Sequence, residues 1–171
     1  LLGSTRAGKD VFSQVLHGGQ ISLLVAFSAA LITTVIAVCI GVSAGYFGGR
    51  VDEFLMALTN VVLVFPQLPL LIILAAFVGQ VGPLMIALII GLSSWAWGAR
   101  VIRSQTLAIR NKEFVLAAEV MGESRLRIIF VEILPNLTSI VFGGAMGTCI
   151  YALMAEAGLE FLGLGDPTII T

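Results

Sequence analysis

Two long stretches without a charged residue constrain the fold of this chain more than any other feature. The first runs from Ile21 to Tyr46, and the second runs from Phe54 to Ala99. A helix rises about 1.5 Å per residue, so the first stretch can cross the roughly 30 Å hydrocarbon core of a bilayer once. The second is long enough to cross it twice. The chain is therefore predicted to be an integral membrane protein built from helices.

The composition excludes an ordinary soluble domain. Hydrophobic residues make up 58% of the 171 residues and charged residues only 11%, whereas soluble domains carry about 25% charged residues. A net charge of −1 gives no reason to expect a nucleic acid partner. Cys39 and Cys149 both lie in apolar runs and are interpreted as small buried hydrophobic residues.

We expect about four membrane-spanning helices in a single transmembrane domain that occupies residues 1–171. Their expected ranges are 21–46, 54–78, 84–99 and 137–154, with turns at 45–49 and 79–83. Pro66 and Pro69 should kink the second helix, as a gate hinge or for packing reasons. Trp95 and Trp97 suit the aromatic belt at a membrane surface. In the last predicted helix, a face of small residues on which another helix could pack is expected from Gly143, Gly144 and Gly147.

The segment before the first span is polar and contains glycine. Residues 1–20 include Arg6 and Lys9, followed by Phe12, Val15 and Leu16 at helical spacing. This pattern predicts a short helix lying at the membrane interface.

Residues 111–136 form the longest polar interruption of the apolar sequence. Asn111 is a plausible N-cap, and an apolar face is predicted from residues at helical spacing, namely Phe114, Ala117, Ala118 and Met121. Gly122 should end this helix. Since Ala118 and Gly122 are four residues apart and small, another surface could approach the helix closely there.

A second helix is predicted to follow directly, with Ser124 as its cap. Arg125 and Arg127 should lie outside. The residues expected inside are Leu126, Ile129, Phe130 and Ile133. Pro135 should break or kink this helix just before the next apolar run.

The distribution of Lys and Arg predicts the orientation. Six of them surround the polar interruption, at positions 100, 103, 110, 112, 125 and 127, and Arg50 lies in a loop on the same face. The other face carries Arg6 and Lys9. Because positive charge marks the cytoplasmic side, residues 111–136 should be cytoplasmic and both ends of the chain extracytoplasmic.

Several of these residues resemble a known family. The pattern Ala117, Ala118, Gly122, Leu134 and Pro135 resembles the Glu-Ala-Ala loop of bacterial ABC importer permeases. The runs Glu113-Phe114-Val115 and Ile133 to Asn136 resemble its dipeptide, oligopeptide and nickel branch. Residues 1–10 and 156–165 are similar to conserved segments of the same branch, with Ser4, Lys9 and Glu160 as variants. Leu116 and Glu132 depart from the general motif, which has glutamate and isoleucine at these positions.

The resemblance implies a fold and a set of partners. The fold would be an all-α polytopic bundle of the type I importer, in the bacterial inner membrane, whose first and last helices lie beyond this fragment. The loop at 111–136 would carry the coupling helix, and its docking residues would be Glu113, Phe114, Ala117, Ala118, Gly122, Leu134 and Pro135. The implied partners are a homologous permease subunit, two cytoplasmic ATPase subunits, an extracytoplasmic substrate-binding protein and membrane lipid. ATP and Mg²⁺ would bind to the ATPase subunits, and the chain itself would hold no cofactor or metal and would not be an enzyme.

The implied substrate is a dipeptide or oligopeptide, with nickel as the alternative within the same branch. An ATP-independent secondary transporter and a membrane scaffold are alternatives of another class. The first three predicted spans contain none of the ionisable residues that a secondary transporter needs near the midplane. Glu119 and Glu123 are either docking contacts or a solvated face, and Glu156 is either functional or solvated at the interface. His17 has no second ligand at metal spacing, and no phosphate-binding glycine loop occurs.

Overall fold

The computed structural model describes residues 3, 10–78 and 82–164, and the elements in this part of the chain are helices. In order they are α1 (Val11–Phe47), α2 (Gly49–Val64), α3 (Gln67–Val78), α4 (Pro83–Ser93), α5 (Trp95–Arg110), α6 (Glu113–Val120), α7 (Arg125–Arg127), the π-helix η1 (Ile128–Ile133) and α8 (Leu134–Phe161). The predicted turn at 79–83 includes residues 79–81, which lie outside the described residues. So do Ser4, Arg6, Lys9 and Gly165.

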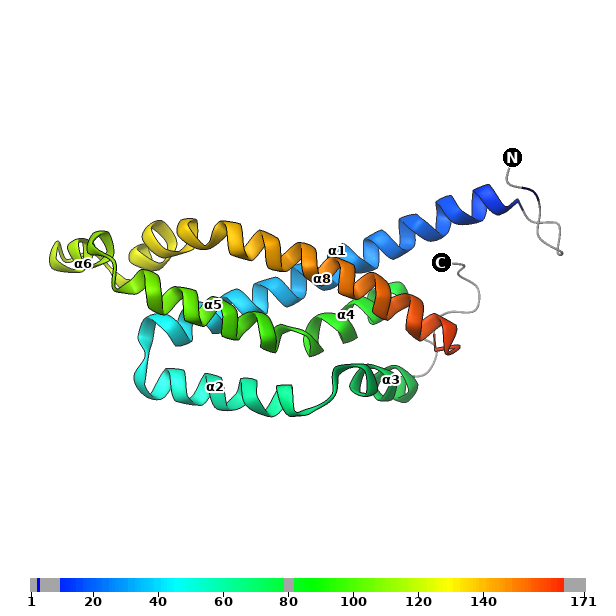
Figure 1. Ribbon diagram of the computed structural model, residues 1–171, viewed down its shortest axis with the longest axis horizontal. Helices are drawn as coiled ribbons and strands as arrows, with labels where there is room; N and C mark the ends of the chain where they lie inside the picture. Colours follow the sequence, from blue (N-terminus) through cyan, green and yellow to red (C-terminus); the bar gives the residue numbers. More distant parts are fainter. Residues whose placement is uncertain (1–2, 4–9, 79–81, 165–171) are drawn as a thin grey trace.

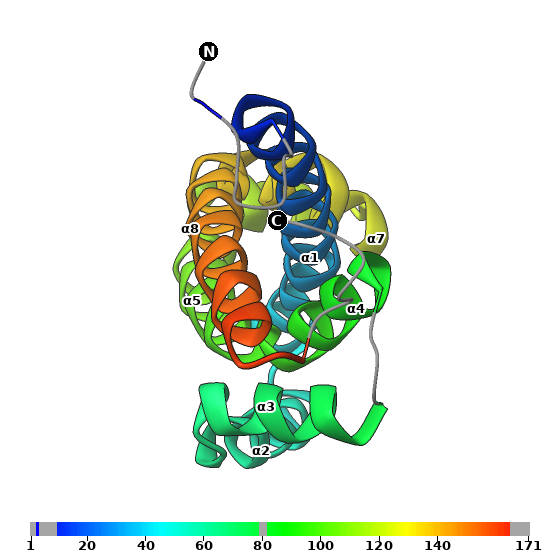
Figure 2. The same ribbon diagram turned by 90° about the vertical axis from the view of Figure 1, so that its right-hand side faces the viewer.

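The helices form an elongated bundle with one separate layer. α1 packs mainly against α5, α8 and α4, and α2 and α3 run along one side of this group (Figures 1 and 2). The short helix α6 lies at one end of the bundle, whereas the start of α1 and the end of α8 lie at the other end (Figure 1).

Two continuous helical segments, Val11–Phe47 and Arg125–Phe161, are long and apolar enough to cross a membrane. Two bent pairs, α2 with α3 and α4 with α5, pass the same test when each pair is taken as one span. The predicted all-α bundle with about four spans is therefore confirmed, counting each bent pair as a crossing.

The start of α1 differs from the prediction of a separate interfacial helix. From Val11 onward the chain is already part of one unbroken helix of 37 residues. Asp10 caps it by accepting a hydrogen bond from the Phe12 N–H at 3.3 Å. Because no proline interrupts the segment, the helix continues through Gly18 and Gly19 and reaches roughly 55 Å in length.

The two prolines near position 66 have different effects. Pro66 separates α2 from α3, which are bent by 81° relative to each other. Phe65 is extended, with φ −76° and ψ 128°, as expected of a residue that precedes proline. Pro69 lies in the first turn of α3, where its missing N–H costs no hydrogen bond. The kink prediction is thus confirmed at Pro66 and wrong at Pro69.

The predicted span at 84–99 is divided, which the sequence did not indicate. α4 ends at Ser93, and α5 continues to Arg110 at an angle of 45°. The Ser93 hydroxyl donates to the carbonyls of Ile89 and Ile90, and such bonds back to the preceding turn often bend helices. Trp97 is 67% exposed, but Trp95 is only 7% exposed, so the belt position predicted for Trp95 is wrong.

Two glycines bring α1 and α5 unusually close together. A Cβ at Gly41 would lie 2.7 Å from the Ala99 carbonyl oxygen, and a Cβ at Gly45 would lie 2.6 Å from Thr106 Cβ. Two small residues four apart allow helix backbones to approach in this way. The crossing leads directly to the end of the bundle that carries α6.

Candidate functional site: α6 and its supports

The boundaries of α6 differ slightly from the predicted ones. Lys112 occupies the N-cap position, and Asn111 instead ends α5, with its N–H bonded to the Ile109 carbonyl. The prediction of Asn111 as the N-cap is therefore wrong by one residue. Glu113 lies in the first turn of α6, where an acidic side chain complements the helix dipole.

Gly122 stops the helix, as predicted. Its φ is +81°, which favours glycine over residues with a side chain. The Gly122 N–H donates to the Glu119 carbonyl at 3.0 Å, and the Glu123 N–H donates to the Ala118 carbonyl at 3.1 Å. This arrangement satisfies the last carbonyls of α6 and turns the chain toward α7.

The structure divides the apolar face predicted for α6. Val115 and Ala118 are buried, in the same apolar cluster as Ile128 and Ile129 of η1. Phe114 and Met121, which were expected on one face with Ala118, are 41% and 74% exposed. Ala118 is buried because η1 packs against the side of α6 that carries Val115 and Ala118, and the other members of the predicted face remain exposed.

Most of the remaining surface of α6 is apolar and uncovered in the part of the chain that the structure describes, beside the exposed side chains of Glu113 and Glu119. Its members are Phe114, Leu116, Ala117, Val120 and Met121, called here the α6 apolar face. Val120 is 88% exposed. Large exposed apolar residues gathered on one short helix are typical of a protein–protein interface.

The residues predicted to dock a partner fall into two groups. Those exposed are Glu113, Phe114, Ala117, Gly122 and Pro135. Ala118 is 4% exposed, and Leu134 is half-buried in the same cluster. Ala118 and Leu134 therefore hold α6 against the bundle, while the exposed residues remain free for contact.

The segment after Gly122 was predicted partly correctly. Ser124 caps α7 by accepting a bond from the Arg127 N–H at 3.4 Å, and Arg125 and Arg127 are exposed. Leu126 and Phe130 were expected inside but are 66% and 64% exposed, and Ile128 is buried in their place. This is because η1 is a π-helix, whose wider turn shifts which residues face inward.

The same π-helix explains why Pro135 does not break the helix. Proline cannot supply the N–H that would bond to the carbonyl four residues earlier. Here the Leu134 N–H donates to the Ile129 carbonyl, five residues back, and the Asn136 side chain donates to the Glu132 carbonyl at 2.7 Å. The helical segment from Arg125 to Phe161 is continuous, so of the two predicted alternatives, a break or a kink, the break is wrong.

Three arginines of α5, whose positions in the sequence indicate only the orientation, contact neighbouring helices in the structure. Arg103 pairs with Asp52 of α2 through both carboxylate oxygens, and Arg100 donates to the Asn60 side chain. Arg110 donates to the main-chain carbonyls at the end of α1. The sequence shows that these arginines recur along one predicted helix, but it does not show which residues they contact.

Glu156 lies inside the bundle and not at a solvated interface. It is 1% exposed, and neither carboxylate oxygen has a hydrogen-bond partner among the residues that the structure describes. The interfacial-solvation interpretation is therefore wrong. Buried ionisable residues within membrane helices are functional candidates, but Glu156 lies near the C-terminal end of α8, and that end of α8 is at the end of the bundle opposite α6 (Figure 1).

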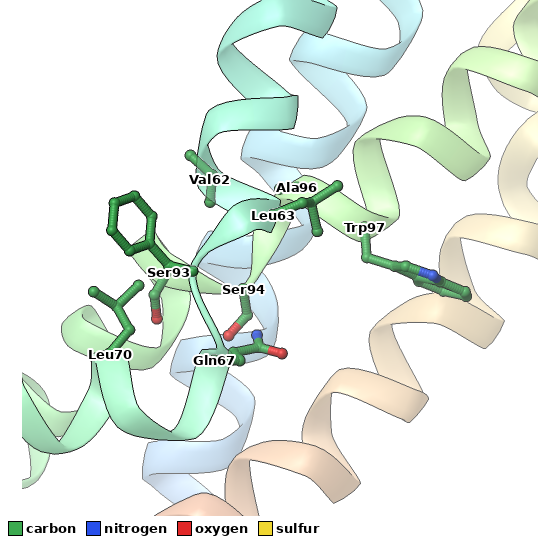
Figure 3. Close-up of a pocket in the computed structure, with 9 residues that line it drawn as sticks. Val62, Leu63, Gln67, Leu70, Ser93, Ser94, Ala96 and Trp97 are labelled. Atoms are coloured by element: carbon green, nitrogen blue, oxygen red, sulfur yellow. The ribbon is translucent and has the colours of Figure 1, made fainter.

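One small cavity lies where the two broken helix pairs meet (Figure 3). Its polar lining comes from Gln67, Ser93, Ser94 and Trp97, and the apolar lining is Val62, Leu63, Phe65, Leu70 and Ala96. Its volume of about 40 Å³ has room for only a few water molecules. As it stands, this cavity cannot hold a peptide.

Comparison with known proteins supports a transport role. Residues 37–171 match the family described as the binding-protein-dependent transport system inner membrane component. The chain belongs to this family. The match includes α6, η1, α8 and most of the elements that support them.

Similar curated proteins agree with this assignment. The chain is 38% identical over 95% of its length to the dipeptide transport system permease protein DppC of Bacillus subtilis, of which it covers 51%. It is 34% identical over 98% of its length to the oligopeptide transport system permease protein OppC of Lactococcus lactis, of which it covers 57%. It is 36% identical over 96% of its length to OppC of Mycobacterium tuberculosis, also covering 57%. The chain thus spans about half the length of these relatives.

The fold also matches a solved transporter. A chain of the MetNI methionine ABC transporter, in inward-facing conformations, superposes with a TM-score of 0.75 at 19% identity, covering 90% of this chain and 76% of that chain. This similarity concerns the fold. The fold that it shows agrees with the family match.

Proposed function

We propose that the chain is the core of a permease subunit that imports dipeptides or oligopeptides, driven by ATP hydrolysis in partner subunits. The observation that carries the proposal is the α6 apolar face. It projects from one end of the bundle and is supported from behind by buried Val115 and Ala118. A short helix held in this way can bind a partner without losing its position.

The proposed partner of this face is a soluble ATPase subunit. α6 lies outside both continuous spanning segments and both bent pairs, so its exposed apolar residues are not part of a membrane-spanning surface. Lys and Arg residues flank it in the sequence, which favours the cytoplasmic side. An ATPase on that side with an apolar groove would cover the face and would bind the ATP and Mg²⁺ itself.

The proposed mechanism is alternating access driven from α6. When two ATPase subunits close on ATP, each pulls on a docked α6, and the spans of this chain and a homologous permease rock as rigid bodies. The path between them then opens to one side at a time. An extracytoplasmic binding protein would deliver the substrate to the end of the bundle opposite α6.

Peptides are the proposed substrate because the similar curated proteins are named as dipeptide and oligopeptide permeases. The nickel alternative is separated by direct measurement. The full-length protein and its partners would be reconstituted in lipid, and ATP-dependent uptake of labelled tripeptides and of Ni²⁺ would be compared. Uptake of Ni²⁺ without peptide uptake would overturn the peptide assignment.

Docking is tested by adding one negative charge to the α6 apolar face. We expect Val120→Asp to abolish co-purification of the ATPase subunits and ATP-dependent uptake, while membrane insertion stays normal. The matched control is Asn111→Asp, which adds the same charge at an exposed neighbour outside this face. Gly122 is less suitable, since its φ of +81° means that any side chain would strain the backbone. Normal ATPase binding by the Val120→Asp protein would contradict the docking proposal.

A further inference from the structure

The end of α1 is capped by a residue of another helix. The last turn of α1 contains no basic residue of its own, although the final carbonyls of a helix need donors and favour positive charge. Arg110, the last residue of α5, supplies them. Its Nη1 lies 3.0 Å from the Tyr46 carbonyl oxygen and 3.4 Å from that of Gly45.

The turn after α1 leaves space for this arginine. Gly48 has φ +64°, and a Cβ at Gly48 would lie 3.2 Å from Arg110 Nη1. The backbone conformation favours glycine at this position, and the turn that Gly48 forms lies directly beside the guanidinium group.

Arg110 also lies directly before α6 in the chain. Only Asn111 and Lys112 separate it from the start of α6 at Glu113. On the other side of the contact, Tyr46 is 7% exposed and belongs to the apolar cluster that contains Val115 and Ala118 of α6. The end of α1 is therefore joined to the root of α6 by Arg110 and shares an apolar cluster with the inner face of α6.

α1 can transmit movement from this point along the whole bundle. It is continuous for 37 residues, whereas the α2–α3 and α4–α5 pairs are bent by 81° and 45°. Its crossing with α5 is tight at Gly41 and Gly45. A displacement of its C-terminal end would therefore reach the opposite end of the bundle without passing through a bend.

We propose that Arg110 is a positioning residue that locks the C-terminal end of α1 to the root of α6, so that movement of α6 is carried along α1. This inference rests on the proposed function. Without the Arg110 contact, α6 would still bind its ATPase partner through the α6 apolar face, because that face does not include Arg110. ATP hydrolysis and transport would then become uncoupled.

The test uses the full-length permease, reconstituted with its partner subunits, and measures ATP hydrolysis and peptide uptake in the same vesicles. In Arg110→Gln we expect hydrolysis to continue while the peptide moved per ATP falls about fivefold or more, the lower end of usual coupling energies between sites. The matched control is Arg50→Gln, the same change at an exposed arginine close to the same end of α1. In this control variant the amount of peptide moved per ATP should remain that of the wild type.

Each outcome bears on the proposal. Peptide uptake per ATP at the wild-type level in Arg110→Gln, or an equal loss in Arg50→Gln, would overturn it. If Arg110→Gln does not assemble, Arg110→Lys decides, since lysine keeps the charge but lacks the planar guanidinium group. If Arg110→Lys moves an amount of peptide per ATP between that of the wild type and full uncoupling, the proposed lock is supported. An amount equal to that of the wild type overturns it. Failure of the broader proposed function would look different, because the wild type itself would show no ATP-dependent uptake.

Discussion

At the scale of single residues, glycines in different helices have opposite environments. Gly41 and Gly45 lie where α1 meets the backbone of α5, and a Cβ at either would come within 3 Å of other atoms. A Cβ added at Gly143, Gly144 or Gly147 of α8 would meet nothing within 4 Å among the described residues. The predicted small-residue face of α8 is thus open in this part of the chain, while the close helix crossing lies elsewhere.

We therefore expect Gly45→Ala to destabilise the protein by about 1–3 kcal/mol, the usual cost of overpacking. The added methyl group would meet Thr106 Cβ and the Arg103 carbonyl oxygen. Thermal unfolding of the purified protein in detergent measures the effect. Gly143→Ala makes the same change in open space and should unfold at the wild-type temperature. Equal unfolding temperatures for the two variants would contradict the close α1–α5 crossing.

At the scale of elements, three prolines have three structural consequences. Pro66 ends a helix, Pro69 fits into a first turn, and Pro135 follows a π-helix that compensates for its missing N–H. The presence of a proline does not by itself predict which of these consequences occurs. The outcome depends on which carbonyl loses its hydrogen-bond partner and on whether neighbouring groups supply another donor.

The break at Pro66 gives a measurable distance. Spin labels at Leu58 and Ile73, which are 45% and 64% exposed, would be roughly 22 Å apart along a straight helix at 1.5 Å per residue. The 81° bend makes the distance shorter in the wild type. We expect Pro66→Ala to lengthen the distance measured by pulsed electron paramagnetic resonance, because the helix can then continue. Pro69→Ala is the control and should not change it.

An unchanged distance in the Pro66→Ala protein would contradict this explanation of the bend. It would mean that contacts of α3 with α4 and α8 hold the bend without the proline. The measurement thus separates a local backbone cause from a tertiary one.

At the scale of the whole molecule, α6 and the ends of α1 and α8 lie at opposite ends of the bundle (Figure 1). The charge distribution predicts which end faces the cytoplasm. With Cys39 and Cys149 replaced by alanine, single cysteines at Asn111 and Leu162 report the sidedness, since both positions are exposed. We expect a membrane-impermeant maleimide to label Leu162→Cys in intact spheroplasts and Asn111→Cys only after lysis. The reverse pattern would contradict the proposed orientation.

The sequence alone determined the membrane class, the approximate spans, the stop at Gly122 and the family resemblance. These depend on hydrophobic length, local backbone preference and short motifs, all of which are local along the chain. Leu116 differs from the family motif, and the structure shows it exposed on the α6 apolar face.

Only the tertiary structure decided which face of α6 is buried, how Pro135 is accommodated and which helix Arg110 contacts. Val115 is buried because η1 packs against it, and η1 adopts that register through bonds made five residues apart. Arg110 reaches Gly45 and Tyr46, which lie 65 and 64 positions earlier in the chain. Such contacts depend on how the helices pack in space, and neither periodicity nor charge counting along the sequence contains that information.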